Sequence, residues 1–413
     1  MGNESNAWIF FKLRRFCESR GSAAIRSRLF VYFIFFIFFY NARVKSWDVV
    51  IIGGGIIGLS LSVALRKHGA TVLIIERGEP GREASHAAGG MLVDCPLETH
   101  AALQPLARAS ARMYPEFAYE LEVESGMKVD LRDHGAIVFP SKHEREWEKV
   151  LAEHAAPASQ LAQLEPGLIA PNRSAFFLKE RSVDPRALTA AALKTAKRRN
   201  VDFSSGDAVT SVNLAEGRVT GITTVKTTFP AAKVVNCAGA WSGQIEFSQI
   251  AGGHTASEQS TPPSVPTRPV KGQILCLASL SRDLLKHVIR SPEVYLIPRS
   301  DGRILAGATV EESGFDKRTD PATMLRFHRA AIALVPELRN AKILEDWAGL
   351  RPGTPDALPI LGATSTPGYY VATGHFRDGI LLAPITAQVM ADVITGVAPA
   401  HDLAAFAPAR FSH

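Results

Sequence analysis

The sequence predicts an α/β protein in which one domain is interrupted by a second, mainly antiparallel β domain. Three observations support this: a strand, glycine turn and helix near residue 50, short strands over residues 127–180, and a return to helix and strand patterns from residue 183. The chain has 413 residues, enough for two domains. Hydrophobic residues make up 46% and charged residues 21%, which is typical of globular proteins.

The stretch Trp47–Glu76 is expected to form one βαβ unit. Residues 48–52 (DVVII) have the apolar run of a buried parallel strand, and residues 59–67 have helical spacing. A second apolar strand over residues 71–75 ends at Glu76. Strand, helix and strand therefore follow each other in the order that a Rossmann-like nucleotide-binding domain requires.

The glycines between the first strand and the helix predict a dinucleotide site. Gly53 allows a tight turn, Gly55 allows the backbone to approach a pyrophosphate, and Gly58 allows the helix to pack closely on the strand. The free N–H groups and the dipole of the helix N-terminus then stabilise the phosphates. The Glu76 carboxylate is placed to accept hydrogen bonds from ribose hydroxyls.

The charge distribution gives no support for nucleic-acid binding. The formal net charge is +6, and residues 1–46 supply all of it, with eight basic and two acidic side chains. The rest of the chain is formally neutral and has no basic stripe with interleaved aromatic residues. The four cysteines are scattered without metal-ligand spacing, so neither a disulfide framework nor a zinc site is indicated, and a reducing compartment fits.

Residues 1–46 form an N-terminal extension that contains an apolar segment at residues 29–40 (LFVYFIFFIFFY). Twelve helical residues span about 18 Å, against roughly 30 Å of bilayer hydrocarbon. We rank an over-extended translation with a working start at Val44 first, a weak membrane anchor second and an export signal third. Cytoplasmic localisation follows from the first interpretation and membrane contact only from the second.

The remaining patterns predict the order of elements after the βαβ unit. Residues 81–92 form a small-residue loop before a helix over 103–126, and residues 347–356 (WAGLRPGTPD) form a Gly-Pro connection before a strand at 369–372. A last helix is expected to start near Gly379-Ile380 and run to Ile394. The other expected helices are 142–154 and 186–199, and the other strands are 136–139, 175–178, 201–203, 208–214, 219–225, 233–236, 272–277, 294–298 and 303–307.

Together these patterns predict a discontinuous domain arrangement. The nucleotide-binding domain is expected at residues 47–95, 183–247 and 345–398. The second domain is expected at residues 96–182 and 270–344, with an exposed Ser, Thr, Gly and Pro-rich connection at 248–269.

Seven sequence runs give the chain from about Val44 a family resemblance: VVIIGGGIIG, AAGGML, CAGAWSG, VKG, YLIPRSDGRILAGAT, WAGLRPGTPDALPILG and GHFRDGILLAP. It resembles the D-amino acid oxidase-like FAD-dependent oxidoreductases, and within them the glycine oxidase branch linked to thiamine biosynthesis. The resemblance implies a non-covalently bound FAD and a substrate domain whose sheet covers the flavin. It also implies a homo-oligomer, as a tetramer.

The resemblance also implies functional roles for individual residues. Arg351 is expected to pair with a substrate carboxylate, Tyr295 to help hold it, Arg377 to line the substrate cavity and Met91 to lie near flavin and substrate. On the residues alone, Arg351 would be an exposed loop arginine and Tyr295 a half-buried strand tyrosine. The implied cofactor-binding residues are Gly53, Gly55, Ile57, Gly58, Glu76, Ala88, Gly89, Met91, Val209, Gly239, Gly374, Gly379 and Ile380.

Two positions depart from the family pattern. Val310 stands where the family has Met, and Asp378 stands where it has Asn. Both are expected near the substrate, so they bear on pocket size and local charge.

The implied reaction is oxidative deamination of glycine or another small primary or secondary amino acid. A hydride leaves the α carbon for flavin N5, and O2 accepts the electrons, which gives an oxo acid, ammonia or an amine, and H2O2. No side chain is expected to act as a catalyst, no metal is expected, and the helix start expected at Gly379-Ile380 is predicted to stabilise negative charge on the flavin. The alternatives are a dehydrogenase of the same fold that reduces a membrane quinone and a non-catalytic FAD-binding protein.

Overall fold

The computed structural model describes residues 45–95, 98–140, 158–169, 174–249 and 264–411. The chain divides into two compact units, residues 1–46 and 47–413, and the description below concerns the second. The apolar segment 29–40 and the expected helix 142–154 lie outside the described residues. In the described part of the chain, no helix combines the length and apolar character needed to cross a membrane.

The first layer is a six-stranded sheet built around the predicted βαβ unit. Its strands follow the order β19 (Ile360–Ala363), β20 (Tyr369–Thr373), β12 (Val234–Asn236), β1 (Val49–Ile52), β2 (Val72–Glu76) and β8 (Asp202–Ser205). All neighbours are parallel except β19, which pairs antiparallel with β20. The helix α3 (Ile56–Lys67) connects β1 to β2 as the spacing predicts.

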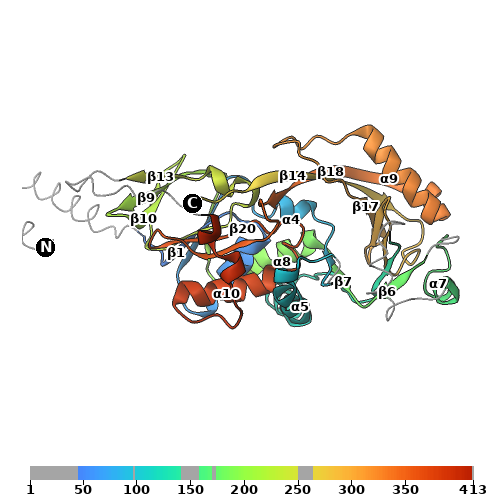
Figure 1. Cartoon of the computed structure of the whole chain (residues 1–413), viewed down its shortest axis with the longest axis horizontal. Helices are drawn as coiled ribbons and strands as arrows, with labels where there is room; N and C mark the ends of the chain where they lie inside the picture. The colour runs from blue at the N-terminus through green and yellow to red at the C-terminus, as the bar shows by residue number, and fades with distance from the viewer. Residues whose placement is uncertain (1–44, 96–97, 141–157, 170–173, 250–263, 412–413) are drawn as a thin grey trace, which may run out of the picture. The chain divides into compact units, whose positions relative to one another are not determined.

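Both faces of this sheet are covered, because alternate side chains of a strand point to opposite faces. Val49 and Ile51 pack in a core with the helices, whereas Val50 and Ile52 pack against a second sheet. The helices are α3, α5 (Gln104–Ser125), α8 (Pro185–Arg198) and α10 (Ala383–Thr395), and the second sheet has the order β11 (Thr228–Pro230), β10 (Arg218–Thr224), β9 (Val209–Ala215) and β13 (Glu246–Gln249) (Figure 1).

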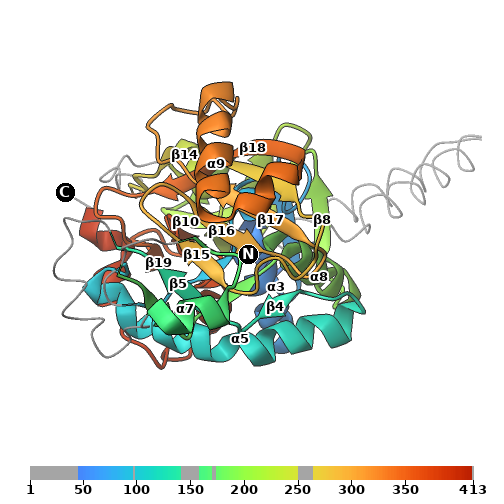
Figure 2. The same ribbon diagram turned by 90° about the vertical axis from the view of Figure 1, so that its right-hand side faces the viewer.

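A seven-stranded sheet forms the other large layer. Its order is β18 (Lys342–Gly353), β14 (Arg268–Ala278), β17 (Arg303–Gly307), β16 (Tyr295–Pro298), β15 (Val288–Arg290), β5 (Ala136–Val138) and β6 (Phe176–Leu178). Helix α9 (Pro321–Leu334) covers one face through Met324, Phe327 and Leu334 (Figure 2). The other face packs against Met91 and carries Tyr295, which is partly buried.

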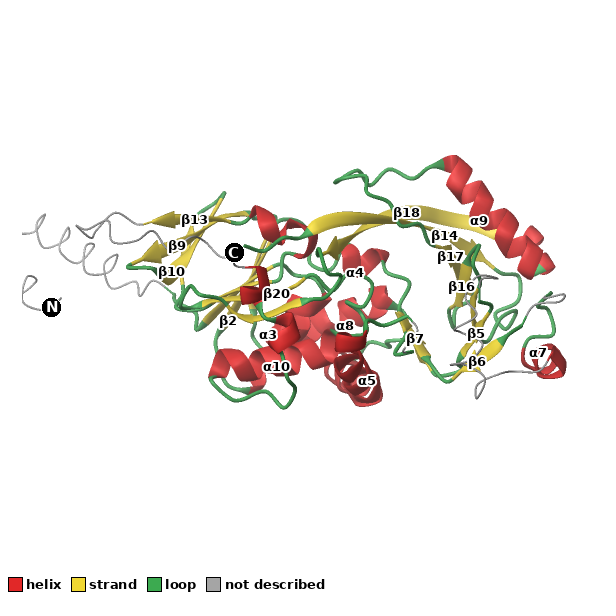
Figure 3. Ribbon diagram, viewed as in Figure 1, coloured by secondary structure: helices red, strands yellow, loops and turns green. Residues whose placement is uncertain are grey.

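Short elements connect the layers. Met91 belongs to a three-stranded sheet with the order β3 (Met91–Leu92), β7 (Arg181–Val183) and β4 (Leu131–Arg132). Figure 3 shows the middle strand, β7. The remaining helices are α4 (Ala84–Ala87) and α7 (Ala158–Leu164), and the 3-10 turns are Ala101–Leu103, Gly239–Gln244, Pro336–Asn340, Ala404–Phe406 and Pro408–Phe411.

Residues 347–356 were expected as a connection, but most of them belong to the long strand β18. The strand pairs with β14 from Lys342 to Gly353, and Pro352 lies opposite Pro269. The glycines and prolines are tolerated here because a continuous partner strand supplies the hydrogen bonds of their neighbours. The expected boundary at residue 345 therefore cuts a strand that lies in the seven-stranded sheet.

Two other expected boundaries are also shifted. The expected connection 248–269 is described only at its ends, where Ser248 and Gln249 belong to β13, Arg268 begins β14 and Val265 is buried; residues 250–263 lie outside the described residues. The last helix begins at Ala383 rather than near Gly379-Ile380, because residues 376–382 form turns before it.

Candidate active site

A cavity of about 1010 Å³ lies where the strand order of the six-stranded sheet reverses direction. Its walls include the turns after β1 and β12 and one face of the seven-stranded sheet, with Gly53, Cys237 and Tyr295 among the lining residues. The carboxyl ends of parallel strands at such a switch point are where α/β proteins bind ligands. The predicted dinucleotide turn therefore opens into a cavity large enough for a cofactor and a small substrate.

The geometry of the glycine turn gives its glycines different roles. Gly53 has a φ of +106°, and a Cβ there would lie 2.5 Å from the carbonyl oxygen of Cys237. A Cβ at Gly58 would lie 2.1 Å from the carbonyl oxygen of Gly53, so this residue lets α3 pack on β1. Gly55 instead lines the cavity, and a Cβ there would meet only Ser85 Oγ, at 3.3 Å.

The first turn of α3 leaves backbone donors for a ligand. Ile56 donates its N–H to Ser85 Oγ at 2.9 Å, and Gly54 donates to Glu76 Oε2 at 2.8 Å. The N–H groups of Gly55 and Ile57 find no acceptor among the described residues. Unpaired N–H groups at a helix start are a binding site for phosphate oxygens.

Glu76 is buried at the end of β2 and also lines the cavity. Its Oε1 accepts a hydrogen bond from the N–H of Gly78 at 2.9 Å, which together with the Gly54 contact fixes both carboxylate oxygens. Each oxygen keeps further acceptor capacity for a hydroxyl donor. The arrangement suits the ribose contact predicted from the sequence.

The predicted cofactor residues mostly converge on this cavity. Ile57, Ala88, Gly89, Met91, Val209, Gly239, Gly379 and Ile380 line it together with Gly53, Gly55 and Glu76. Gly58 and Gly374 do not. Gly374 has a φ of +75°, and a Cβ there would lie 2.5 Å from Thr354 Cγ2, so its place in the structure is to shape the turn after β20.

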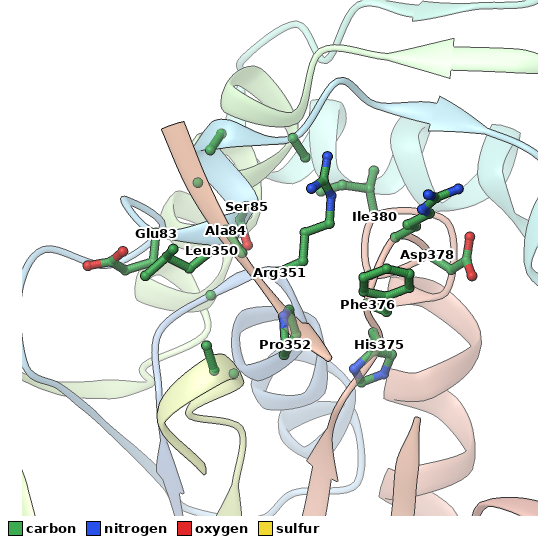
Figure 4. Close-up of a pocket in the computed structure, with 18 of the residues that line it drawn as sticks. Glu83, Ala84, Ser85, Leu350, Arg351, Pro352, His375, Phe376, Asp378 and Ile380 are labelled. Carbon is green, nitrogen blue, oxygen red and sulfur yellow. The ribbon is translucent and has the colours of Figure 1, made fainter. Parts of the chain in front are cut away.

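Arg351 extends from β18 into the other part of the cavity (Figure 4). Its Nη1 donates to the carbonyl oxygens of Lys271 at 3.2 Å and Thr309 at 3.1 Å. Within the described part of the chain, Nε and Nη2 have no hydrogen-bond partner. The guanidinium lies against Gly272, where a Cβ would be 2.3 Å from the nitrogens, so its position depends on that glycine.

Tyr295 places its hydroxyl near Gly89 and Gly307, where added Cβ atoms would lie 3.5 and 3.1 Å from it. Burial raises the pKa of Tyr295 to about 12, although Arg351 and Arg377 lower it. Burial also lowers the pKa of Arg351 below its ordinary value. The hydroxyl stays protonated and the guanidinium stays charged at neutral pH, so both can donate hydrogen bonds to an anion.

The loop after β20 carries the other predicted substrate residues. Arg377 is exposed, and Asp378 is half-buried with its pKa raised to about 7 by burial, an effect that Glu98 increases and Arg377 opposes. Figure 4 shows Arg351 beside the loop that carries His375, Phe376 and Asp378. Val310 also lines the cavity. Both positions that depart from the family pattern, Val310 and Asp378, are therefore cavity-lining residues.

His375 is unsuited to acid–base chemistry in this site. It is buried, its Nε2 lies 3.1 Å from Thr386 Oγ1, and burial lowers its pKa to about 3. The ring is therefore neutral at physiological pH. Across the residues that the structure describes, no group of three or more His, Cys, Asp or Glu side chains could hold a metal ion.

The family of FAD-dependent oxidoreductases designated DAO matches residues 48–393. The chain belongs to this family. It is 31% identical over 377 residues to glycine oxidase from Pseudomonas putida, covering 88% of this chain and 98% of the relative. A crystal structure of glycine oxidase from Geobacillus kaustophilus superposes with a TM-score of 0.79 at 29% identity, covering 88% of this chain and 99% of that one.

A third relative has a different architecture. The bifunctional protein ThiO/ThiG of Nostoc sp. is 33% identical over 359 residues, which cover 84% of this chain and 52% of that protein. The resemblance to the D-amino acid oxidase-like family and the predicted fold class are thereby confirmed.

FAD is the cofactor of this DAO-family protein, and its cavity suits the molecule. The unpaired N–H groups of Gly55 and Ile57 suit the pyrophosphate, the open face of Gly55 leaves room for it, and Glu76 suits a ribose. The backbone donors, the open face of Gly55 and the Glu76 carboxylate are separate features of one cavity, and each suits a part of FAD.

Sequence patterns missed several residues of the site. Ser85, in the short helix α4, binds the start of α3 from 29 positions away, and Arg77 lies 3.4 Å over the ring of Trp241, which stacks on Phe315. Arg77 and Trp241 both line the cavity. Ser85 lies in the segment 81–92 that was expected as a small-residue loop, and Arg77 directly follows Glu76, so proximity to these motifs was the available signal.

Proposed function

We propose that this protein oxidises glycine or another small primary or secondary amino acid, with FAD as cofactor and O2 as electron acceptor. The products are an oxo acid, ammonia or an amine, and H2O2; glycine, O2 and water give glyoxylate, ammonia and H2O2. The observation that carries the proposal is the Arg351 guanidinium, which enters the cavity beside Tyr295 with two donor nitrogens free of protein partners among the described residues. When bound, FAD supplies the acceptor for the hydride that leaves the α carbon.

The side chains of the site bind and orient the substrate. A guanidinium forms two parallel hydrogen bonds with a carboxylate, and this fixes direction as well as distance. The Tyr295 hydroxyl adds a donor from the neighbouring part of the sheet. With the carboxylate held, the α carbon and its amine are confined to the space beside Gly89 and Met91, which line the same cavity.

The space near the anchor favours small substrates. Gly89 and Gly272 line the cavity here, and an added Cβ at either would lie within 2.8 Å of a neighbouring side chain, so these walls are already in close contact with their surroundings. No side-chain base is proposed, since the amino acid is taken to bind with a neutral amine. The similarity to glycine oxidase and to ThiO/ThiG further supports a place for the product in thiamine (thiazole) biosynthesis.

The test is a substrate panel on purified holoprotein, scored for H2O2 and ammonia together. We expect glycine or a comparably small amino acid to give equal amounts of both. Flavin reduction by an amino acid without peroxide, but with turnover on a quinone analogue, would instead establish a dehydrogenase. A flavin that no amine reduces would establish a non-catalytic FAD-binding protein. Native mass measurement on the same sample tests the proposed homo-oligomer.

A further inference from the structure

Arg299 is a buried cation that the proposed reaction does not use. It directly follows β16, and its relative exposure is 1%, so it is among the largest fully buried side chains in the described part of the chain. Burying a charge costs free energy unless the charge is paired and hydrogen-bonded. The contacts of the Arg299 guanidinium should therefore show why an arginine is buried at this position.

The contacts of Arg299 join two separate elements. Its Nη2 donates to the carbonyl oxygen of Gly89 at 2.6 Å, and its Nε lies 3.9 Å from Asp184 Oδ2. Asp184 caps α8 by accepting hydrogen bonds from the N–H groups of Arg186 at 2.8 Å and Ala187 at 3.3 Å. One guanidinium therefore connects the cavity-lining loop at residues 88–91 to the start of α8.

The pairing of Arg299 is incomplete. Its Nε and Nη1 have no hydrogen-bond partner in the described part of the molecule. Asp184 is shared with Arg303, whose Nη2 lies 2.7 Å from Oδ2. Burial lowers the pKa of Arg299, whereas Asp184 and Asp130 raise it. A neutral side chain of similar length would avoid the desolvation cost, so stability alone does not account for an arginine here.

Arg299 also continues a row of side chains that contact Gly89. Tyr295, Ile297 and Arg299 alternate along the chain and so point to the same side. A Cβ at Gly89 would lie 2.8 Å from Ile297 Cδ1 and 3.5 Å from the Tyr295 hydroxyl. Gly89 is thus held against the same stretch of chain that carries the proposed carboxylate-binding tyrosine.

The opposite side of the loop is fixed as well. Gly90 has a φ of +79°, and its carbonyl oxygen accepts a hydrogen bond from the N–H of Val183 at 2.9 Å. A Cβ at Gly90 would lie 2.0 Å from the carbonyl oxygen of Val183. The loop at residues 88–91 therefore lies between β7 and β16, and the Arg299 contact sets its position along β16.

We propose that Arg299 is a positioning residue: by fixing the Gly89 carbonyl it sets the spacing between the cavity-lining loop at residues 88–91 and Tyr295. This step rests on the proposed function, in which FAD binds beside Gly89 and Met91 and the substrate carboxylate beside Tyr295: the spacing that Arg299 sets then controls how the α carbon meets FAD. A misplacement of about 1 Å in such an arrangement costs roughly 100-fold in rate.

The experiment compares Arg299→Met, Arg299→Lys and the control Arg303→Met, all purified with FAD. Arg303 binds the same Asp184 but does not contact Gly89. For Arg299→Met we expect an altered visible circular dichroism spectrum of the flavin, about 10-fold weaker FAD binding, and kcat lowered by roughly 10- to 100-fold. KM should change less than about threefold, since Arg351 is intact, and Arg299→Lys should recover part of each loss.

Arg303→Met should lower the melting temperature while the flavin spectrum, the FAD Kd and kcat stay at wild-type values. The proposal is overturned if Arg299→Met or Arg299→Lys loses only thermal stability, or if Arg303→Met reproduces their effects. Should Arg299→Met fail to fold, the lysine variant decides. The turnover measurements rest on the proposed function, whereas the flavin spectrum and FAD Kd do not, so a wild type that oxidises no amino acid would refute that function and leave Arg299 testable.

Discussion

At the scale of single residues, Arg351 carries the substrate assignment. Removing one member of a buried charged, hydrogen-bonded pair costs about 2–5 kcal/mol. Arg351→Ala should therefore lower kcat/KM on small amino acids by roughly 30- to several-thousand-fold. Arg351→Lys should recover only part of this, because an ammonium keeps the charge but cannot form two parallel hydrogen bonds. FAD content should stay at the wild-type value.

The control for Arg351 is an amine substrate without a carboxylate. Wild type and Arg351→Ala should oxidise this amine at similar rates, while only wild type oxidises glycine well. If the mutation depresses both reactions equally, Arg351 is not the carboxylate anchor. Tyr295→Phe should cost less, about 0.5–1.5 kcal/mol for a single neutral hydrogen bond.

Asp378 should make stability depend on pH. Its pKa is raised to about 7 in the folded chain by burial, with Glu98 adding to the effect and Arg377 opposing it, whereas an unfolded Asp has a pKa of about 3.9. The folded state therefore prefers the neutral acid, and this preference stabilises the protein fully below about pH 4. The stabilisation is lost as pH rises through about 7.

Asp378→Asn removes this ionisation and should gain stability over wild type as pH rises. We expect the free energies of unfolding to differ by about 1–3 kcal/mol at pH 8. Each unit of difference between the folded and unfolded pKa corresponds to roughly 1.4 kcal/mol, and solvent in the cavity screens part of this. Urea denaturation of both proteins from pH 4.5 to 8.5 measures it. The pKa of Glu180 is also raised to about 7 by burial, but it is present in both proteins and cancels. A difference that stays constant with pH would refute the assignment.

Single residues were predictable where a motif fixes their backbone and less so elsewhere. Gly53, Gly55 and Glu76 follow from the βαβ pattern alone. Arg351 was expected only through the family resemblance, because on its own it resembles an arginine in a Gly-Pro loop. Arg299 was missed because the surrounding residues resemble a turn, and its partners Gly89 and Asp184 lie far away in the sequence.

At the scale of elements, the turn between β1 and α3 should separate cofactor binding from folding. Gly55→Val places a side chain in the cavity, so it should give a folded but colourless protein whose apo melting temperature is close to that of wild-type apoprotein. Gly58→Ala places a Cβ 2.1 Å from Gly53 O, so it should destabilise the apoprotein itself by about 1–3 kcal/mol.

Flavin absorbance and apoprotein melting curves measure these two effects separately. Equal loss of apoprotein stability in both variants would contradict the division of roles. A yellow Gly55→Val protein would show that the pyrophosphate does not lie over this residue.

Elements with a strong local pattern were predicted well, and those that depend on a distant partner were not. The unit β1, α3 and β2 lies within a few residues of its expected bounds. The strand β18 was not expected, because Gly349, Pro352 and Gly353 favour turns until β14 pairs with them. The start of α10 was placed too early, since the residues before Ala383 form turns instead of continuing the helix.

At the scale of the whole molecule, the cavity exists because distant segments assemble into two sheets. β15 pairs parallel with β5 across about 150 positions, and β14 pairs with β18 across about 75. No local sequence pattern predicts such long-range pairings. The sequence therefore indicated an inserted domain but not the arrangement of its strands. The face of this sheet that carries Tyr295 then completes a cavity begun by the βαβ unit.

The second unit should be sufficient for FAD binding and turnover. It begins at Trp47, whose Nε1 donates to Asp202 Oδ2 at 2.7 Å, and the family match begins at residue 48. A shortened chain that starts with a new Met before Lys45 should therefore be yellow and as active per flavin as the full chain. Both chains are assayed with O2 and, in membranes, with a quinone. If the shortened chain binds FAD but loses turnover, while the full chain reduces quinone in membranes, residues 1–44 take part in the reaction and the anchored dehydrogenase is the correct assignment.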